Sequence, residues 1–349
     1  MSLMPLNVSC VNGEHTPIHA SLSTCLPEGF LQAHQLEVMS EEAQGTNEPT
    51  VALLTGGNHH NGYNGTTLST VSAFPQPANC TLPDLPLPRD GPTTFVTAGA
   101  EPSIVTCGGW NGTSFTLSCL TLKDGQWVGP GAGGVVNDLP SDRTWGSVVS
   151  LAGHGVYMLG GPYGDQSSTS IFLEAGSPVW RRGPALPIPM VYPCTVALNS
   201  SFLAVSDDQI HEFNIRSLQW EKGTTWARLE VSRYYQPGCA VTGDYLVIAG
   251  GTVVGSRETE VFSLRTKDIS LKGPQMVRAR SFLHLVTVQP GSRTIAFGGR
   301  SLHGSTWLYP EEVEELEGGE WRVVGRLPSP PGGRSSSGGV AVPTSMICA

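Results

Sequence analysis

VALLTGG at residues 51–57 is the first of five short apolar runs that end in a pair of glycines. The other four are SIVTCGG (103–109), VYMLGG (156–161), YLVIAGG (245–251) and TIAFGG (294–299). The first glycines lie at 56, 108, 160, 250 and 298, so the intervals are 52, 52, 90 and 48 residues. The long interval predicts one further unit, and SFLAVSD at 201–207 lies at its middle, with Ser206-Asp207 in place of the glycines. Regular intervals of this size predict a repeat architecture of six units.

Two further features recur in phase with the glycines. Most units are preceded by a Leu-Pro turn or a relative of it, often followed by Arg and an aromatic residue: LPLPRD (85–90), LPSDRTW (139–145), LPIPMVY (186–192), LEVSRYY (229–235), QMVRARSF (275–282) and LPSPPGGR (327–334). A tryptophan opens the last short strand of four units: Trp127, Trp180, Trp220 and Trp321. Each unit is therefore expected to form four short strands, with the tryptophans packed between units.

These glycine pairs, turns and spaced tryptophans resemble kelch repeats, which form one propeller blade per repeat of about 50 residues. The resemblance covers roughly residues 50–343, and CGGWNGTSFTLSCLTLKDGQW (107–127) is similar to secreted kelch-like proteins of invertebrates. The fourth unit departs from the pattern because it lacks the glycines, and the first because it lacks the tryptophan. The resemblance implies an all-β, six-bladed β-propeller that recognises peptides on one face.

The blade count also predicts how the ring closes. Residues 51–85 supply only three strands of the first blade, and Gly339 to Pro343 fit its missing innermost strand. Closure of this kind removes an exposed sheet edge. The competing donor is FLQAHQLEV at 30–38. We therefore expect residues 1–49 to form an N-terminal extension and residues 50–349 to form the propeller.

Composition limits the partners of the chain. Hydrophobic residues make up 39% and charged residues 14%, a balance that disordered chains do not show. The formal net charge is −9 and no basic run exists, which argues against nucleic acid and anionic membranes as partners. No apolar stretch approaches the ~18 residues needed to span a bilayer.

Two features favour an extracellular protein, although Met1 to Asn12 lack the basic and apolar regions of a signal peptide. Cysteine occurs eight times, and five N-glycosylation sequons are present, at Asn7, Asn64, Asn79, Asn111 and Asn199. We expect secretion after removal of a leader. The alternative is a cytoplasmic protein with free thiols.

The cysteines fall into groups with different expectations. Cys107 and Cys119 face each other if the hairpin between them is symmetric about residue 113, which predicts a disulfide. Cys10 and Cys25 could bridge each other within the N-terminal extension.

The other four cysteines give weaker indications. Cys194 and Cys239 occupy equivalent places on inner strands, and we expect two buried free thiols there. The pairing of Cys80 and Cys348 is left open.

Motifs for catalysis, metal binding or cofactor binding are absent from the sequence. The chain lacks GxSxG, HExxH, a phosphate-binding loop and zinc-like cysteine spacing, and His59-His60 lies in a polar loop. Galactose-oxidase-like copper enzymes and sialic-acid mutarotases share this class of fold, but none of their ligands or motifs can be placed here. We therefore expect a non-enzymatic protein without metal or cofactor, because fold analogy alone does not establish an activity.

A ligand is expected on one face of the propeller. The loops between second and third strands and the turns between blades open there, among them 58–65, 110–114, 252–258 and 300–305. Arginine and aromatic residues in these turns are the types that anchor partners. The predicted ligand-binding residues are Arg89, Arg143, Trp145, Tyr192, Arg233, Tyr235, Arg280 and Phe282.

The arginines recur at one phase of the repeat, so we expect a ring of guanidinium groups and a protein or peptide ligand, acidic in character, bound by a monomer. A purely structural role, in which the arginines pair within the channel, is the alternative. A second functional hypothesis is a sugar-handling propeller, lectin-like or mutarotase-like. Carboxylates and histidines with shifted pKa values inside the channel would favour that hypothesis.

Overall fold

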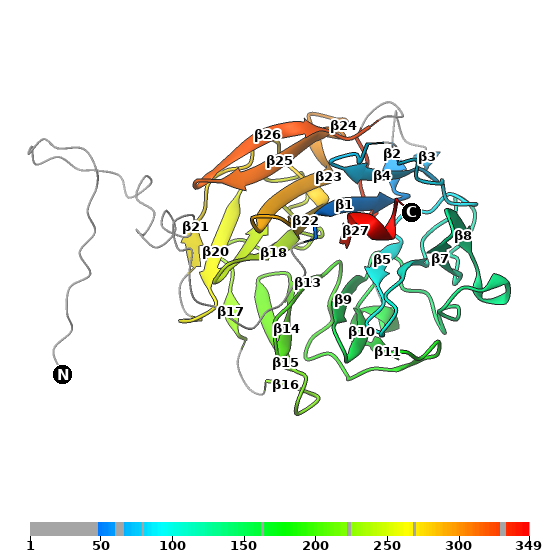
Figure 1. The fold of residues 1–349 in the computed structure, drawn as a ribbon. Helices are drawn as coiled ribbons and strands as arrows, with labels where there is room; N and C mark the ends of the chain where they lie inside the picture. Colours follow the sequence, from blue (N-terminus) through cyan, green and yellow to red (C-terminus); the bar gives the residue numbers. More distant parts are fainter. Residues whose placement is uncertain are drawn as a thin grey trace, which may run out of the picture.

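The computed structural model describes residues 48–59, 66–78, 80–161, 164–221, 225–267, 270–328 and 333–348. Six small antiparallel sheets lie in a ring around a central channel and form a six-bladed β-propeller (Figure 1). The predicted fold class is confirmed. Cys10, Cys25 and the alternative closing strand at 30–38 lie outside the described residues.

The first blade combines the two ends of the described chain. Its strand order from the channel outward is β27 (Gly338–Pro343), β1 (Thr50–Thr55) and β4 (Val71–Phe74). Between β1 and β4, the short strands β2 (Asn58–His59) and β3 (Thr66–Thr67) form a separate hairpin. The pairing of β1 with β27 runs from Thr50 opposite Pro343 to Thr55 opposite Gly338, so the C-terminal strand closes the ring beside β1 (Figure 1).

The other five blades each stack four consecutive strands outward from the channel. The second blade contains β5 (Thr93–Val96), β6 (Ile104–Cys107), β7 (Cys119–Lys123) and β8 (Gln126–Val128), and the third contains β9 (Ser147–Leu151), β10 (Gly155–Leu159), β11 (Ser170–Glu174) and β12 (Trp180–Arg182). The fourth contains β13 (Cys194–Ala197), β14 (Ser201–Ser206), β15 (Gln209–Asn214) and β16 (Gln219–Trp220), with β17 (Ala227–Arg228) paired to β15, and the fifth contains β18 (Gly238–Thr242), β19 (Tyr245–Ala249), β20 (Thr259–Ser263) and β21 (Ser270–Lys272). The sixth contains β22 (Ser281–Val288), β23 (Arg293–His303), β25 (Glu312–Glu317) and β26 (Glu320–Arg326), with β24 (Thr306–Leu308) paired to β23. Short 3-10 turns lie at η1 (Pro130–Ala132), η2 (Gly164–Ser168) and η3 (Thr344–Met346).

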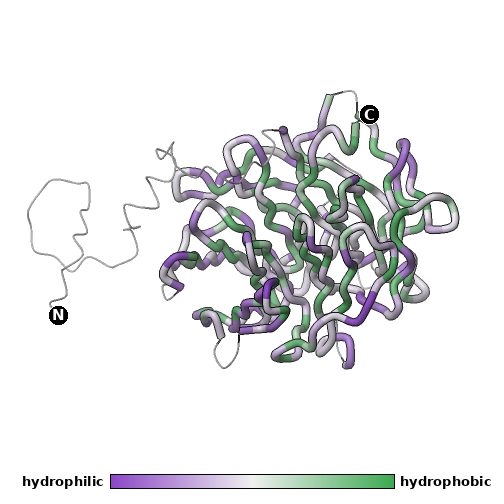
Figure 2. The backbone as a smooth tube through the Cα atoms, turned by 60° about the horizontal axis from the view of Figure 1, so that its bottom comes forward, coloured by the Kyte–Doolittle hydropathy of each residue, from purple (hydrophilic) through white to green (hydrophobic). Residues whose placement is uncertain are grey.

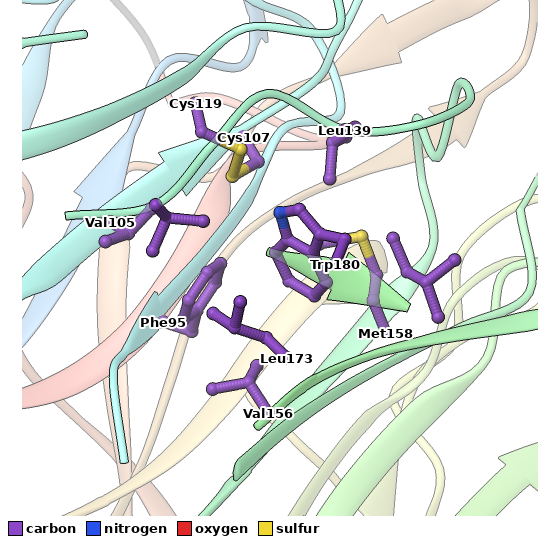
Figure 3. Close-up of a cluster of buried hydrophobic side chains, with 11 residues drawn as sticks. Phe95, Val105, Cys107, Cys119, Leu139, Val156, Met158, Leu173 and Trp180 are labelled. Carbon is purple, nitrogen blue, oxygen red and sulfur yellow. A yellow bond between two sulfur atoms is a disulfide. The ribbon is translucent and has the colours of Figure 1, made fainter. Parts of the chain in front are cut away.

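The hydrophobic core lies between neighbouring blades, because each sheet buries both of its faces. Apolar segments follow the strands, while many of the polar segments lie in loops (Figure 2). Between the second and third blades, Trp180 packs edge-to-face against Phe95, with ring centroids 5.9 Å apart, beside Met158 (Figure 3). Its indole Nε1 donates to the carbonyl oxygen of Asn137 at 3.1 Å. This confirms that Trp180 serves inter-blade packing, as the sequence predicts.

The glycine pairs lie where the end of a second strand contacts the turn that leads into the next blade. Gly250 and Gly251 follow β19 with φ of +67° and +86°, a region that favours glycine. The amide of Gly251 donates to the carbonyl oxygen of Arg280, which leads into the next blade, at 3.0 Å. A Cβ on Gly250 would overlap that same carbonyl group, which explains the demand for glycine. In the sixth blade, β23 runs through Gly298 and beyond, so the pair does not end the strand there.

The fourth blade forms the corresponding end of its second strand without glycine. Val205 lies opposite Cys194, two residues after the left-handed Tyr192, as Ala249 lies opposite Gly238, two residues after the left-handed Gln236, so Ser206 occupies the place of the first glycine. Ser206-Asp207 therefore stands in the place of the glycine pair, as the sequence indicates. Asp207 adopts φ of +57°, a conformation that Asp tolerates better than most residues.

Three disulfides link the cysteines of the described chain. Cys107 and Cys119 are paired across β6 and β7 and bonded, as predicted (Figure 3). A second bond joins Cys80 to Cys348, and therefore ties the C-terminal segment to the first blade.

The third disulfide corrects an expectation. Cys194 and Cys239 are bonded, not free, with Cα atoms 6.0 Å apart. They lie on β13 and β18, the inner strands of adjacent blades. The period of the repeat places them at equivalent heights, but it does not show that inner strands approach one another at the channel.

Candidate ligand-binding face

One end of the propeller is built from the loops between second and third strands and from the turns that enter each inner strand. We call this end the loop face. Backbone bridges join the two sets of segments, such as Asp90 with Trp110 and Ser256 with Arg280. The predicted ligand-binding residues all belong to these turns, and the structure gathers them around the channel mouth.

The predicted arginines are buried, not exposed. Arg89, Arg143, Arg233 and Arg280 have at most 5% of their surface accessible. The guanidinium of Arg280 donates to the carbonyl oxygens of Gly298 and Glu312 in its own blade, both at 2.6 Å. The carbonyl oxygen of Arg280 accepts the amide of Gly251 in the preceding blade, and that of Arg89 accepts the amide of Gly57, so these two arginines each link two blades. The expected ring of exposed guanidinium groups is therefore absent for these four residues, and with it the argument for an acidic partner.

Charge compensation of the buried arginines differs from blade to blade. Arg233 pairs with Glu260 and Arg280 with Glu314, with N–O distances of 2.8 Å in both cases. Arg89 instead donates to the carbonyl oxygen and hydroxyl of Ser118, and burial lowers its pKa to about 10. These contacts agree with a structural role of the arginines, which the sequence analysis left open as the alternative to ligand binding.

Six residues with left-handed backbone conformation surround the channel mouth, one from each blade. We call this set the mouth ring: Gly91, Trp145, Tyr192, Gln236, Phe282 and Ser336, with φ between +41° and +68°. Amides and carbonyls link much of the ring: Phe282 N to Gln236 O (3.1 Å), Ser336 N to Phe282 O (3.4 Å), Gly91 N to Ser336 O (2.6 Å) and Trp145 N to Gly91 O (2.9 Å). Strained conformations of this type concentrate at functional sites.

Aromatic rings spread across the mouth from these positions. Trp145 and Tyr192 have ring centroids 6.1 Å apart, and Tyr192 and Phe282 are 5.2 Å apart. Tyr235 lies 5.9 Å from Phe282. Tyr192 and Phe282 are buried, whereas Trp145 and Tyr235 are half-buried and open to a ligand. The four predicted aromatic residues are therefore brought together.

Two further aromatic residues extend this cluster, although they were not among the predicted ligand-binding residues. Trp110 lies 5.0 Å from Phe115, and Phe115 lies 6.3 Å from Trp145, measured between ring centroids. Both belong to the loop between β6 and β7, and Phe115 is 46% exposed. The sequence indicated this part of the site only through the prediction that the loop at 110–114 lies on the ligand-binding face.

A groove of about 420 Å³ opens beside these rings. It is lined by Asn58, Thr67, Asp90, Trp110, Gly112, Phe115 and Trp145. Asp90 accepts hydrogen bonds from Asn58 Nδ2 at 3.1 Å and from Trp145 Nε1 at 3.4 Å. Burial raises the pKa of the Asp90 carboxyl group, while the two hydrogen bonds and the charge of Arg300 oppose this change. We call this cavity the aromatic groove.

One cation that the loop face presents is Arg300. Its guanidinium lies 4.6 Å from the ring centroid of Phe282 and 4.6 Å from that of Trp307, and the side chain is half-buried. Stacking of this kind holds a guanidinium in place without an ion pair. The sequence placed its loop on this face but did not single out the residue.

Exposed apolar side chains concentrate in the same loops. Of the twelve exposed large apolar residues among those described, five lie between second and third strands: Phe115, Leu117, Val253, Val254 and Leu308. Apolar residues gathered on one face mark interaction surfaces more often than isolated ones do.

The channel itself offers a smaller space of about 90 Å³, lined by the inner strands of all six blades. Among the described residues that line it, His284 is the one whose side chain titrates. Burial lowers the pKa of His284 to about 4, and Nε2 of the neutral ring donates to the carbonyl oxygen of Ser337 at 2.6 Å.

Other potential sites were sought in the part of the chain that the structure describes. No group of three or more His, Cys, Asp or Glu side chains there could hold a metal ion. His59 contacts the carbonyl oxygen of Gly333 at 2.9 Å, and His60 lies outside the described residues. The described helices are all too short or too polar to cross a bilayer. In comparisons with known proteins, neither a family model nor a curated protein matches the chain.

Proposed function

We propose that this chain is a kelch-type propeller that binds a protein or peptide on its loop face and catalyses no reaction. The observation that carries the proposal is the aromatic groove, open beside exposed Phe115 and half-buried Trp145. Aromatic side chains around a concave site are the residues that contribute most to binding at protein interfaces. Exposed apolar residues in other loops of the same face add further contact surface for a peptide.

We further propose that the protein is secreted and monomeric. Three disulfides in the described chain are compatible with an oxidising compartment. The sequon at Asn111 lies in the loop beside the groove, and that at Asn199 lies exposed on the hairpin between β13 and β14. Glycosylation at Asn111 would limit access to the groove from one side.

The sugar-handling alternative has less support. A mutarotase-like site was expected to combine carboxylates and histidines in the channel, but the described lining residues include His284 without a carboxylate. Thr, Ser, Gly and apolar residues make up most of the lining. We therefore treat sugar binding as an outcome of the experiment and not as a second proposal.

Panning a phage-displayed random dodecapeptide library against the propeller tests the proposal. Peptides that bind the wild type should lose at least tenfold in affinity to the double variant W110A/F115A. V179A is the matched control, because Val179 is 47% exposed but lies between β11 and β12, away from the loop face. Selection of no peptide, together with binding on a glycan array, would replace the proposal with the sugar-binding alternative. Equal binding to W110A/F115A would reject this face.

A further inference from the structure

Asp90 is a buried carboxylate without a cation. It is 8% exposed, and none of the ion pairs between described residues includes it. The comparison with Glu260 and Glu314 is informative, since these two buried carboxylates each pair with an arginine. Burial of a carboxylate is costly unless a cation or several donors compensate its charge. Asp90 receives two neutral donors, one of them at 3.4 Å.

A second acceptor beside Asp90 also has no donor. Asn58 turns its Nδ2 toward Asp90, and its Oδ1 is buried without a hydrogen-bond partner among the described residues. Asn58 and Asp90 both line the aromatic groove. The groove therefore contains two acceptors, the Asp90 carboxylate and Asn58 Oδ1, to which an N–H group of a ligand can donate.

The charged and titratable groups around Asp90 do not supply that donor. Arg300 is held between Phe282 and Trp307 and forms no ion pair with Asp90 among the described contacts. Tyr309 interacts with Arg300, and its pKa is raised by burial. Arg300 thus reduces the negative potential at Asp90, but the carboxylate oxygens of Asp90 keep lone pairs that can accept hydrogen bonds from a ligand.

The walls of the groove suit the rest of a cationic side chain. Trp110, Phe115 and Trp145 present aromatic rings, which attract cations at their faces and pack well against alkyl chains. A planar guanidinium carries several donors in one fork, so it can donate to a carboxylate and to a neighbouring amide oxygen together.

We propose that the aromatic groove receives an arginine side chain of the bound peptide, with the guanidinium on Asp90 and Asn58 Oδ1 and the alkyl stem against Trp110 and Phe115. This inference rests on the proposed function and specifies its ligand chemistry. It reverses the charge that the sequence favoured, because the arginines that suggested an acidic ligand are buried.

The test uses two dodecapeptide pools that are random except at position six, which is arginine in one and citrulline in the other. Citrulline keeps the shape of arginine and removes its charge. Peptides captured by the immobilised wild-type protein are quantified by mass spectrometry, and we expect the arginine pool to be enriched at least tenfold over the citrulline pool. In D90N the ratio should fall to about one, whereas V179A should keep it.

The outcomes separate this inference from the proposed function. Equal capture of the two pools, with both lost in W110A/F115A, would overturn the arginine inference and leave the peptide-binding function intact. Capture that W110A/F115A does not reduce would overturn both. The comparison of pools on the wild type needs no substitution, so it decides the matter if D90N fails to fold.

Discussion

Arg280 and Glu314 are both completely buried, and the guanidinium Nη2 lies 2.8 Å from the carboxylate Oε1. The fifth blade repeats this pair as Arg233 and Glu260. In the fourth blade Met190 takes the place of the arginine, and His211, which lies opposite Ala204 as Glu314 lies opposite Ala296, takes the place of the carboxylate; both are buried. The fourth blade therefore has neither member of the ion pair, whereas the second keeps Arg89 with the carbonyl oxygen and hydroxyl of Ser118 in place of a carboxylate.

This relationship predicts how the pair responds to substitution. Arg280→Met leaves Glu314 buried without its cation and should lower the free energy of unfolding by about 3–5 kcal/mol. R280M/E314I removes both charges and should recover most of that loss, but not all of it, because Glu314 also accepts the amides of Val277 and Arg278. Urea unfolding measures both effects.

A matched control is the exposed pair of Arg181 and Glu174, 3.5 Å apart. Arg181→Met should cost at most about 1 kcal/mol. If R280M costs no more than R181M, the buried pair does not hold the blades together.

The disulfide of Cys80 and Cys348 should stabilise the ring closure more than the other bonds stabilise their blades. It spans 268 residues, against 12 for Cys107 and Cys119. Because the loss of chain entropy grows with loop length, C80A/C348A should lower the free energy of unfolding by up to about 5 kcal/mol and C107A/C119A by about 3 kcal/mol or less. Chemical denaturation of the two variants gives the order, and the reverse order would refute this account of closure.

Most of the fold could be predicted from the repeat period, but some contacts between particular residues could not. Glycine pairs and tryptophans locate the blades because their roles recur in most units, so their spacing alone indicates the ring. The bond of Cys194 with Cys239 is different, since it depends on how closely adjacent inner strands approach each other.

The site was predictable only in part for a related reason. Arginine at one phase of the repeat indicates a shared environment, but the pattern is the same for an exposed ring and for buried links between blades. Trp110, Asp90 and Asn58 belong to single units and have no repeat signal, so only their positions in the folded loop face reveal the groove.

The mouth ring predicts opposite effects of two small substitutions. Ser336 has φ of +52°, so Ser336→Gly should relieve strain and raise the free energy of unfolding by about 0.5–1 kcal/mol. Gly91 has φ of +68°, and a Cβ there would overlap the Trp145 indole, so Gly91→Ala should lower it by more than about 1 kcal/mol. Thermal unfolding of both variants is the measurement, and stabilisation by G91A would contradict the geometry.

His284 predicts a specific loss of stability in acid. Its folded-state pKa of about 4 lies below the ordinary histidine value of 6.5, so the unfolded chain binds the proton more readily. The contribution is complete above pH 6.5 and is lost as the pH falls from 6.5 to 4, by up to about 3 kcal/mol. The difference between wild type and H284Q in urea unfolding should shrink over this range, and a constant difference would show that His284 does not titrate this way.

Hydrogen–deuterium exchange with and without a dodecapeptide selected on the wild-type protein tests the central claim most directly. If the loop face binds the ligand, amides of 89–92 and 108–118, beside the aromatic groove, should gain protection. The hairpin between β15 and β16 lies at the opposite end of the fourth blade and should exchange unchanged. Protection of that hairpin or of the outer strand β26, with none at 108–118, would contradict the proposal that the loop face is the binding surface.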